Sequence, residues 1–158
     1  MDSVKYDSSH EELIDKKGKN LLARISSKDN KIVIQNALDF SIKMHEGQKR
    51  KSGLPYVSHC IDVANILLDW NMDYTTIISA LLHDLVEDTN VSLEDIDKVL
   101  SIEPRHFGAL SGQARIFIKL QKYEKAIKSI ERALEFYPSF KSRELIPEIE
   151  RLIKEDSI

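Results

Sequence analysis

Apolar residues recur at intervals of three and four along most of this chain, and few residues interrupt that pattern. Between residues 32 and 44 one set of apolar positions fits a buried helix. That set comprises Val33, Ala37, Leu38, Phe40, Ile42 and Met44. With only five glycines and four prolines among 158 residues, a turn-rich β fold is disfavoured. We therefore predict an all-α protein.

Breaks in the pattern mark the expected ends of the helices in the first 100 residues. A polar tail and a modest amphipathic helix fill residues 1–30, and the helix at 32–44 is followed by a loop with Gly47, Gly53 and Pro55. A third helix is expected from about 57 to 70, and a fourth from Thr75 through Leu82 towards Glu87. The inner face of the third helix is expected to carry Val63, Ala64, Ile66, Leu67 and Trp70.

The charge balance and cysteine content limit the expected partners and surroundings. Lys and Arg number 23 against 26 Asp and Glu, a net charge of −3, which disfavours nucleic acid or an anionic membrane as partner. The single cysteine, Cys60, cannot form an internal disulfide, so a reducing compartment is expected. The N-terminal residues lack the apolar stretch of a secretory signal, and no apolar run is long enough to cross a bilayer. We expect a cytoplasmic protein that binds neither nucleic acid nor membrane.

One short stretch carries most of the candidate chemistry. His83 and Asp84 directly follow an apolar run that ends at Leu82. An imidazole nitrogen beside a carboxylate oxygen suits manganese, iron, zinc or magnesium better than a metal that prefers thiolates. Glu87 and Asp88 lie four residues further on, so a continuing helix places them on the same face, where a carboxylate can deprotonate a metal-bound water. The alternative is an ordinary charged helix end in solvent.

Two features before this cluster are candidates for the same site. His59 stands near the start of the third helix, within reach of a site formed by the fourth. Arg50 and Lys51 lie beside Gly53 in the preceding loop, where their side chains are suited to contact a phosphate. Taken alone, His59 fits a helix-capping residue as well as a ligand, and the two cations fit a solvated basic loop.

Residues from about 37 to 96 resemble the N-terminal hydrolase domain of the Rel/SpoT family, which makes and degrades the guanosine alarmones ppGpp and pppGpp. The resemblance lies in the order and spacing of ALDFSIKMHEGQKRKSGLPYVSHC, DVANIL and ALLHDLVEDT. It implies a truncated HD-type domain that releases pyrophosphate from ppGpp and leaves GDP, within the stringent response. It also implies that His59, His83 and Asp84 bind a metal, typically manganese in that family. Glu87 and Asp88 correspond to the acidic pair that activates the attacking water.

The resemblance also assigns a nucleotide-binding loop and shows where the chain departs from the family. Arg50, Lys51 and Ser52 fall on the loop that contacts the nucleotide, so ppGpp or pppGpp is the expected ligand. Leu54 stands where an acidic residue is usual, and Cys60 where proline is usual. The family's fourth metal ligand, an Asp in an Ala-Asp-Arg-Leu-His-Asn-type motif, has no counterpart after residue 100. Weak or absent hydrolysis is therefore expected unless a second copy or a partner supplies the missing helix.

The residues after Pro104 resemble a tetratricopeptide repeat (TPR). The run PRHFGALSGQARIFIKLQKYEKAIKSIERALEFYP fits the length and residue classes of that repeat. Small residues at Ala114, Ala126 and Ala133 allow its two helices to approach closely. Helices are expected at about 107–120 and 123–136, with a capping helix at about 143–155. An ordinary amphipathic hairpin is the alternative.

Three regions and three functions follow from these observations. We expect a tail and first helix at 1–30, a truncated HD-like hydrolase domain at 31–100, and a TPR-like hairpin with capping helix at 101–158. The leading hypothesis is a manganese-dependent ppGpp pyrophosphohydrolase, weak or inactive; the alternatives are a non-catalytic interaction module and a fusion remnant. The helical face left exposed by the truncation is expected to be covered by the repeat helices, a protein partner or a second copy.

Overall fold

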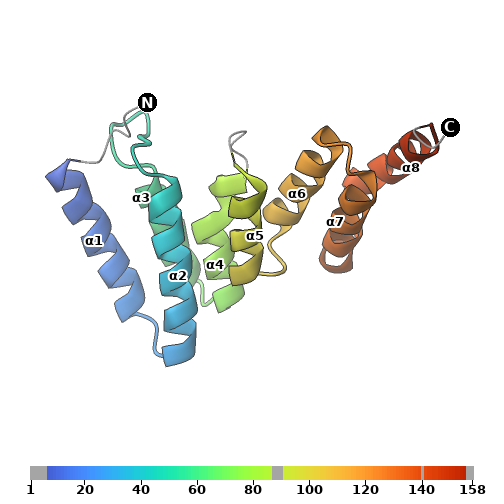
Figure 1. Ribbon diagram of the computed structural model, residues 1–158. Coiled ribbons are helices and arrows are strands. Elements are labelled where there is room, and N and C mark those ends of the chain that lie inside the picture. The colour runs from blue at the N-terminus through green and yellow to red at the C-terminus, as the bar shows by residue number, and fades with distance from the viewer. Residues whose placement is uncertain (1–6, 87–90, 140, 156–158) are drawn as a thin grey trace. The chain divides into compact units, whose positions relative to one another are not determined.

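We describe the fold from a computed structural model, which defines residues 7–86, 91–139 and 141–155 (Figure 1). Every regular element within these ranges is a helix, which confirms the all-α prediction. The chain separates into two compact units, Met1–Leu85 and Val86–Ile158, and each is described by itself. Within the same ranges, no helix combines the length and apolar character needed to traverse a bilayer.

The described residues of the first unit form four α-helices, and the unit ends within a turn of 3₁₀-helix. The α-helices are α1 (Ser8–Ala23), α2 (Lys28–Met44), α3 (Val57–Asp69) and α4 (Tyr74–Leu82), and the 3₁₀ turn is η1 (His83–Val86). Side-chain oxygens of Asp7, Ser27 and Asp73 accept hydrogen bonds from backbone N–H groups in the first turns of α1, α2 and α4. These caps satisfy N–H groups that the helix itself leaves without partners.

Helix α4 is the centre of this unit. It packs against both α2 and α3, while α1 packs mainly against α3. Its apolar side chains Ile77, Leu81 and Leu82 are all fully buried. Lys17 of α1 forms an ion pair with Asp62 of α3 at 2.6 Å, beside this apolar contact. The residues that carry the candidate chemistry therefore directly follow the most buried helix of the unit.

The inner face of α3 differs from the one expected. Val57, Cys60, Ile61 and Ala64 are fully buried, whereas Ile66 is 46% and Trp70 69% exposed. At about 100° per residue, positions 66 and 70 lie on the opposite side of the helix from the buried set. The expectation that Ile66 and Trp70 face inward was therefore wrong, because apolar residues occur on both sides of α3 and only packing selects one.

The helix expected to continue past Leu82 changes type there. The α-helix ends at Leu82, and His83–Val86 forms the 3₁₀ turn η1. A 3₁₀-helix has about three residues per turn, so the four-residue spacing no longer places side chains one above the other. Residues 87–90 lie outside the described ranges.

The second unit is a series of antiparallel helices. It comprises α5 (Leu93–Ile102), α6 (Phe107–Lys119), α7 (Tyr123–Phe136), the 3₁₀ turn η2 (Lys141–Leu145) and α8 (Ile146–Glu155). A capping box starts α5, with the Ser92 and Asp95 side chains each bonded to the other's backbone N–H. Helices α6 and α7 form the predicted hairpin, and Ala114, Ala126 and Ala133 are buried in it. Ile149 of α8 joins the same core as Ala126 and Ile130.

Candidate metal centre

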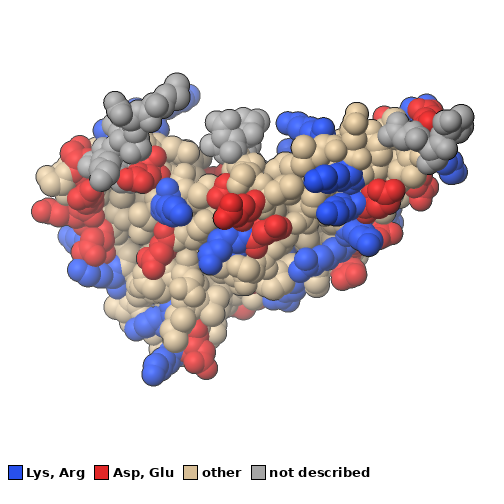
Figure 2. All heavy atoms as spheres, in the orientation of Figure 1, with Lys and Arg blue, Asp and Glu red and all other residues tan. Residues whose placement is uncertain are grey.

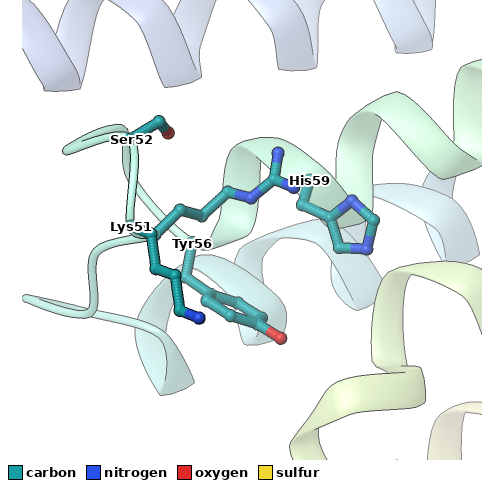
Figure 3. A pocket seen from close by; sticks show the side chains of 5 residues that line it. Lys51, Ser52, Tyr56 and His59 are labelled. Atoms are coloured by element: carbon teal, nitrogen blue, oxygen red, sulfur yellow. The ribbon is translucent and has the colours of Figure 1, made fainter.

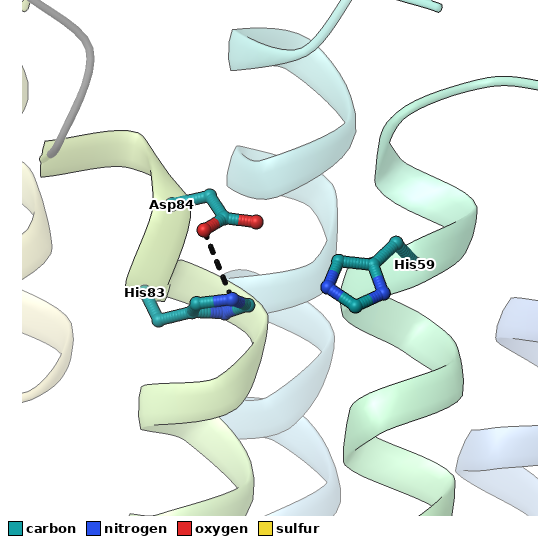
Figure 4. Close-up of side chains that lie close together, drawn as sticks. All are labelled: His59, His83 and Asp84. Carbon is teal, nitrogen blue, oxygen red and sulfur yellow. Dashed lines mark ion pairs between the residues drawn. The ribbon is translucent and has the colours of Figure 1, made fainter. Parts of the chain in front are cut away.

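Three of the predicted site residues converge at the end of α4. His59 extends from the first turn of α3, and His83 and Asp84 extend from η1 (Figure 4). Each offers one nitrogen or oxygen atom, and these three atoms lie within 4.8 Å of one another. The two imidazole rings face each other edge to face with centroids 5.9 Å apart. Residues 24 positions apart in sequence therefore form one cluster of metal-binding groups.

The imidazole of His83 is held in one tautomer. Its Nδ1 atom lies 2.7 Å from the carbonyl oxygen of Ala80, which can only accept a hydrogen bond, so Nδ1 carries a proton. The other ring nitrogen, Nε2, lies 3.0 Å from Oδ1 of Asp84. In a neutral ring with a proton on Nδ1, Nε2 carries a lone pair. This lone pair and the carboxylate oxygen are both acceptors, so a proton or a metal ion between them is needed for an attractive contact. Histidine ligands in metalloproteins commonly donate their second ring N–H to a carbonyl in this way.

Two neighbouring side chains hold the other side of Asp84. The phenol of Tyr56 donates a hydrogen bond to the carboxylate, and burial together with the charge of Asp84 raises the pKa of this phenol. The thiol of Cys60 lies 4.0 Å from Oδ2 of Asp84. Burial, and then the same charge, raises the pKa of the thiol to about 12, so it is protonated at neutral pH. The carboxyl group of Asp84 thus lies between the phenol of Tyr56 and the thiol of Cys60.

A row of aromatic rings leads into the cluster. His45 stacks on Tyr56 with centroids 5.0 Å apart, and Tyr56 meets the edge of His59 at 6.3 Å. His45 is itself nearly fully buried, and its Nδ1 lies 2.8 Å from Oε1 of Gln48. Tyr56 is therefore fixed on one face by His45 while its hydroxyl reaches Asp84.

The loop between α2 and α3 makes a tight turn next to these rings. The N–H of Gly53 donates to the carbonyl of Arg50 and the N–H of Arg50 donates to the carbonyl of Leu54, both at 2.8 Å. Gly53 has a φ of 85°, which residues with a side chain rarely adopt. This combination is a β-turn closed by a glycine bulge. It places the exposed side chains of Lys51 and Ser52 at the tip of the turn.

The tip of the turn and the rings together border an open pocket of about 520 Å³. Figure 3 shows Lys51, Ser52, Tyr56 and His59 around this pocket, with Tyr56 and His59 on one side and Ser52 at the end of the loop. Arg50 completes the lining. A pocket lined by Arg50, Lys51, the hydroxyl of Ser52 and the candidate metal ligand His59 is suited to an anionic ligand.

The structure places six of the eight predicted site residues around one location. His59, His83 and Asp84 form the cluster, while Arg50, Lys51 and Ser52 line the adjoining pocket that His59 also borders. The predicted catalytic residues, Glu87 and Asp88, lie outside the described residues.

Sequence reasoning did not single out Tyr56 or His45. Tyr56 lines the pocket and hydrogen-bonds to Asp84, and His45 supports its ring. One signal in the sequence could have identified Tyr56: it lies between the basic residues of the loop and His59.

Comparison with known proteins finds similarity over the segment that carries these residues. Residues 37–104 match the HD domain family. A probable GTP pyrophosphokinase of Mycobacterium leprae is 43% identical over 79 residues, which are 50% of this chain and 10% of that protein. The GTP pyrophosphokinase of Myxococcus xanthus is 40% identical over 74 residues, 47% of this chain and 10% of the relative.

A third relative is named as a hydrolase. A probable guanosine-3′,5′-bis(diphosphate) 3′-pyrophosphohydrolase of Mycoplasma pneumoniae is 44% identical over 71 residues, which are 45% of this chain and 10% of that protein. The matched segment thus spans about a tenth of each of these relatives. Residues 37–104 of this chain are therefore similar to HD domains, this chain is also similar to short segments of these relatives, and His59, His83 and Asp84 all lie in residues 37–104.

Proposed function

We propose that the HD region binds a manganese ion and hydrolyses ppGpp or pppGpp at the 3′-pyrophosphate. For ppGpp, one water is consumed, the bond between the 3′-oxygen and the first phosphorus breaks, and GDP and pyrophosphate are released. The observation that carries the proposal is the convergence of His59, His83 and Asp84 within 4.8 Å beside a pocket with basic residues. The likeness to a segment of a named bis(diphosphate) 3′-pyrophosphohydrolase supports the choice of substrate.

The donor set fits a divalent cation of this kind. Two imidazole nitrogens and one carboxylate oxygen suit manganese, and the Ala80 carbonyl leaves Nε2 of His83 as the ring atom that can ligate. When bound, the ion supplies Lewis-acid polarisation of a phosphoryl oxygen and lowers the pKa of a bound water. His59, His83 and Asp84 hold the ion, and Tyr56 orients the carboxylate of Asp84.

The remaining residues bind the substrate and move a proton. Arg50 and Lys51 neutralise phosphate oxygens at the mouth of the pocket, and Ser52 donates a hydrogen bond there. Glu87 or Asp88 accepts the proton of the attacking water, and the 3′-oxygen of GDP leaves protonated. Among the described residues there are three candidate ligands, whereas the resembled family uses four, so we expect slow turnover unless a second copy or a partner completes the site.

The test is hydrolysis of ppGpp by the full chain with Mn²⁺, followed by GDP and pyrophosphate release. His83→Ala removes a ligand, and His10→Ala removes a histidine of α1 as the matched control. Turnover that disappears in His83→Ala and persists in His10→Ala supports the proposal. Manganese bound at one ion per chain without turnover contradicts hydrolysis but not the metal site. No difference in manganese binding between the wild type and His83→Ala contradicts both.

A further inference from the structure

Helix α7 carries its charges in two separate rows. Lys125, Lys128 and Arg132 fall within about 60° of one another when residues are placed at about 100° intervals around the helix. Glu124, Glu131 and Glu135 form a second row beside them, and the buried residues Ala126, Ile130 and Ala133 lie on the far side. Lys122 directly precedes the helix and lies about 60° from Lys125 and about 120° from Lys128 on the same projection. We call Lys122, Lys125, Lys128 and Arg132 the basic stripe.

The basic stripe lies in a locally cationic part of an acidic chain. Residues 105–143 contain nine Lys or Arg and three Glu, although the whole chain has a net charge of −3. All four side chains of the stripe are exposed. Figure 2 shows Lys and Arg side chains gathered over the surface of α6 and α7. The stripe spans about 15 Å along the helix, since each residue advances it by about 1.5 Å.

The described residues form no ion pair with a member of the stripe, although Glu124, Glu131 and Glu135 lie in the neighbouring row. Among the ion pairs formed by residues 7–86, 91–139 and 141–155, none involves a member of the stripe. Lys125 lies over the ring of Phe117 at 5.8 Å, and Arg132 donates to the carbonyl of Pro104 at 3.0 Å. Like charges at helical spacings of three and four repel each other. An anion laid along the stripe relieves that repulsion.

Exposed aromatic rings stand at one end of the stripe. Phe136, on the same side of α7 as the stripe, is 40% exposed. Next to it, Tyr137 is 47% exposed and meets the edge of Phe107 at a centroid distance of 4.9 Å. An apolar side chain of a partner can therefore pack against these aromatic rings at the end of the stripe.

We propose that the basic stripe docks an acidic peptide segment that ends in an apolar residue. Four cations over about 15 Å match a run of four to six Asp or Glu residues, and the aromatic rings match the terminal apolar side chain. The net charge of −3 disfavours a long polyanion such as nucleic acid. This inference concerns a surface and a partner class separate from the metal centre.

The experiment is fluorescence anisotropy of the full chain with a dye-labelled Glu-Glu-Glu-Glu-Glu-Phe peptide, without metal or nucleotide. Lys122→Gln/Lys128→Gln neutralises two exposed members of the stripe. The control is Lys98→Gln/Lys154→Gln, which replaces one exposed lysine in α5 and one in α8 and changes the net charge by the same amount as the first pair. We expect the first pair to weaken binding about fivefold or more, as the loss of two exposed ion pairs implies, and the second less than twofold. Phe136→Ala is expected to lower affinity for this peptide but not for hexaglutamate.

Three results overturn the proposal. If no binding of the peptide is detected at millimolar protein, the basic stripe is not a docking site for it. Equal losses in the two double variants show attraction to net charge alone. In a competition experiment, a single-stranded 16-mer of DNA and the unlabelled peptide each displace the labelled peptide. If the DNA does so at the lower concentration, the stripe binds nucleic acid instead. Circular dichroism of each variant establishes that α7 remains helical.

Discussion

Nε2 of His83 lies 3.0 Å from Oδ1 of Asp84, while Nδ1 of the same ring is occupied by the carbonyl of Ala80. The ring therefore has one nitrogen left for a ligand, and that nitrogen points towards a carboxylate rather than into solvent. His59 approaches the pair from a different helix. Because all three groups favour a shared cation, substitutions that disturb their orientation are expected to act on metal affinity before they act on folding.

Tyr56→Phe tests whether the phenol orients Asp84. The variant keeps the ring that stacks on His45 and removes the hydroxyl that donates to the carboxylate. We expect Mn²⁺ affinity to fall about 10- to 100-fold, the usual effect of losing a group that orients a ligand, with little change in Tm. Isothermal titration with Mn²⁺ measures the affinity.

The control for this substitution is Tyr74→Phe, which removes a hydroxyl at the other end of α4. Its Mn²⁺ affinity should equal that of the wild type. An unchanged affinity in Tyr56→Phe, with metal binding still dependent on His83, would show that the phenol has no positioning role.

Gly53→Ala tests the turn that presents Lys51 and Ser52. Nothing within 4 Å blocks an added Cβ, but the φ of 85° is strained for alanine. We expect the variant to lose about 1–2 kcal/mol of local stability and to bind the nucleotide more weakly. Gly53→Asn should lose less, because asparagine tolerates this conformation better. Amide hydrogen exchange of residues 49–56 reports the loop, and equal protection in wild type and Gly53→Ala would contradict the prediction.

Ile61→Ala and Ile66→Ala test which side of α3 is packed. Ile61 is fully buried and Ile66 is 46% exposed, although both lie on the same helix. We expect the first substitution to reduce the free energy of unfolding by about 2–5 kcal/mol and the second by about 0.5 kcal/mol. Urea denaturation followed by circular dichroism gives both values. Similar losses would mean that the exposed side of α3 is covered in solution.

Cys60 should resist alkylation in the folded protein. Its side chain is fully buried and its pKa is raised to about 12. At pH 8 about one thiol in 10⁴ is ionised, and the thiolate is the reactive form. We expect iodoacetamide to modify Cys60 readily in 8 M urea, where the pKa returns to its ordinary range, and very slowly without urea. Comparable rates in the two conditions would indicate frequent opening of α3.

The sequence by itself determined the helical class, most helix ranges and the chemistry available to the site. Helical period, caps such as Ser92 with Asp95, and breaks at glycine and proline act over a few residues, so they can be recognised without a fold. The resemblance then identified His59, His83 and Asp84 as one set, and the structure brings them within 4.8 Å.

Tertiary structure decided what depends on contacts between distant segments. The burial of one side of α3 and the exposure of Trp70 depend on packing with α1 and α4, because apolar residues occupy both sides of that helix. The change from α-helix to 3₁₀-helix after Leu82 aims His83 at Asp84. The role of Tyr56 arises only when the loop before α3 and the end of α4 meet. Local spacing records which side of a helix a residue occupies, but not which neighbour that side will meet.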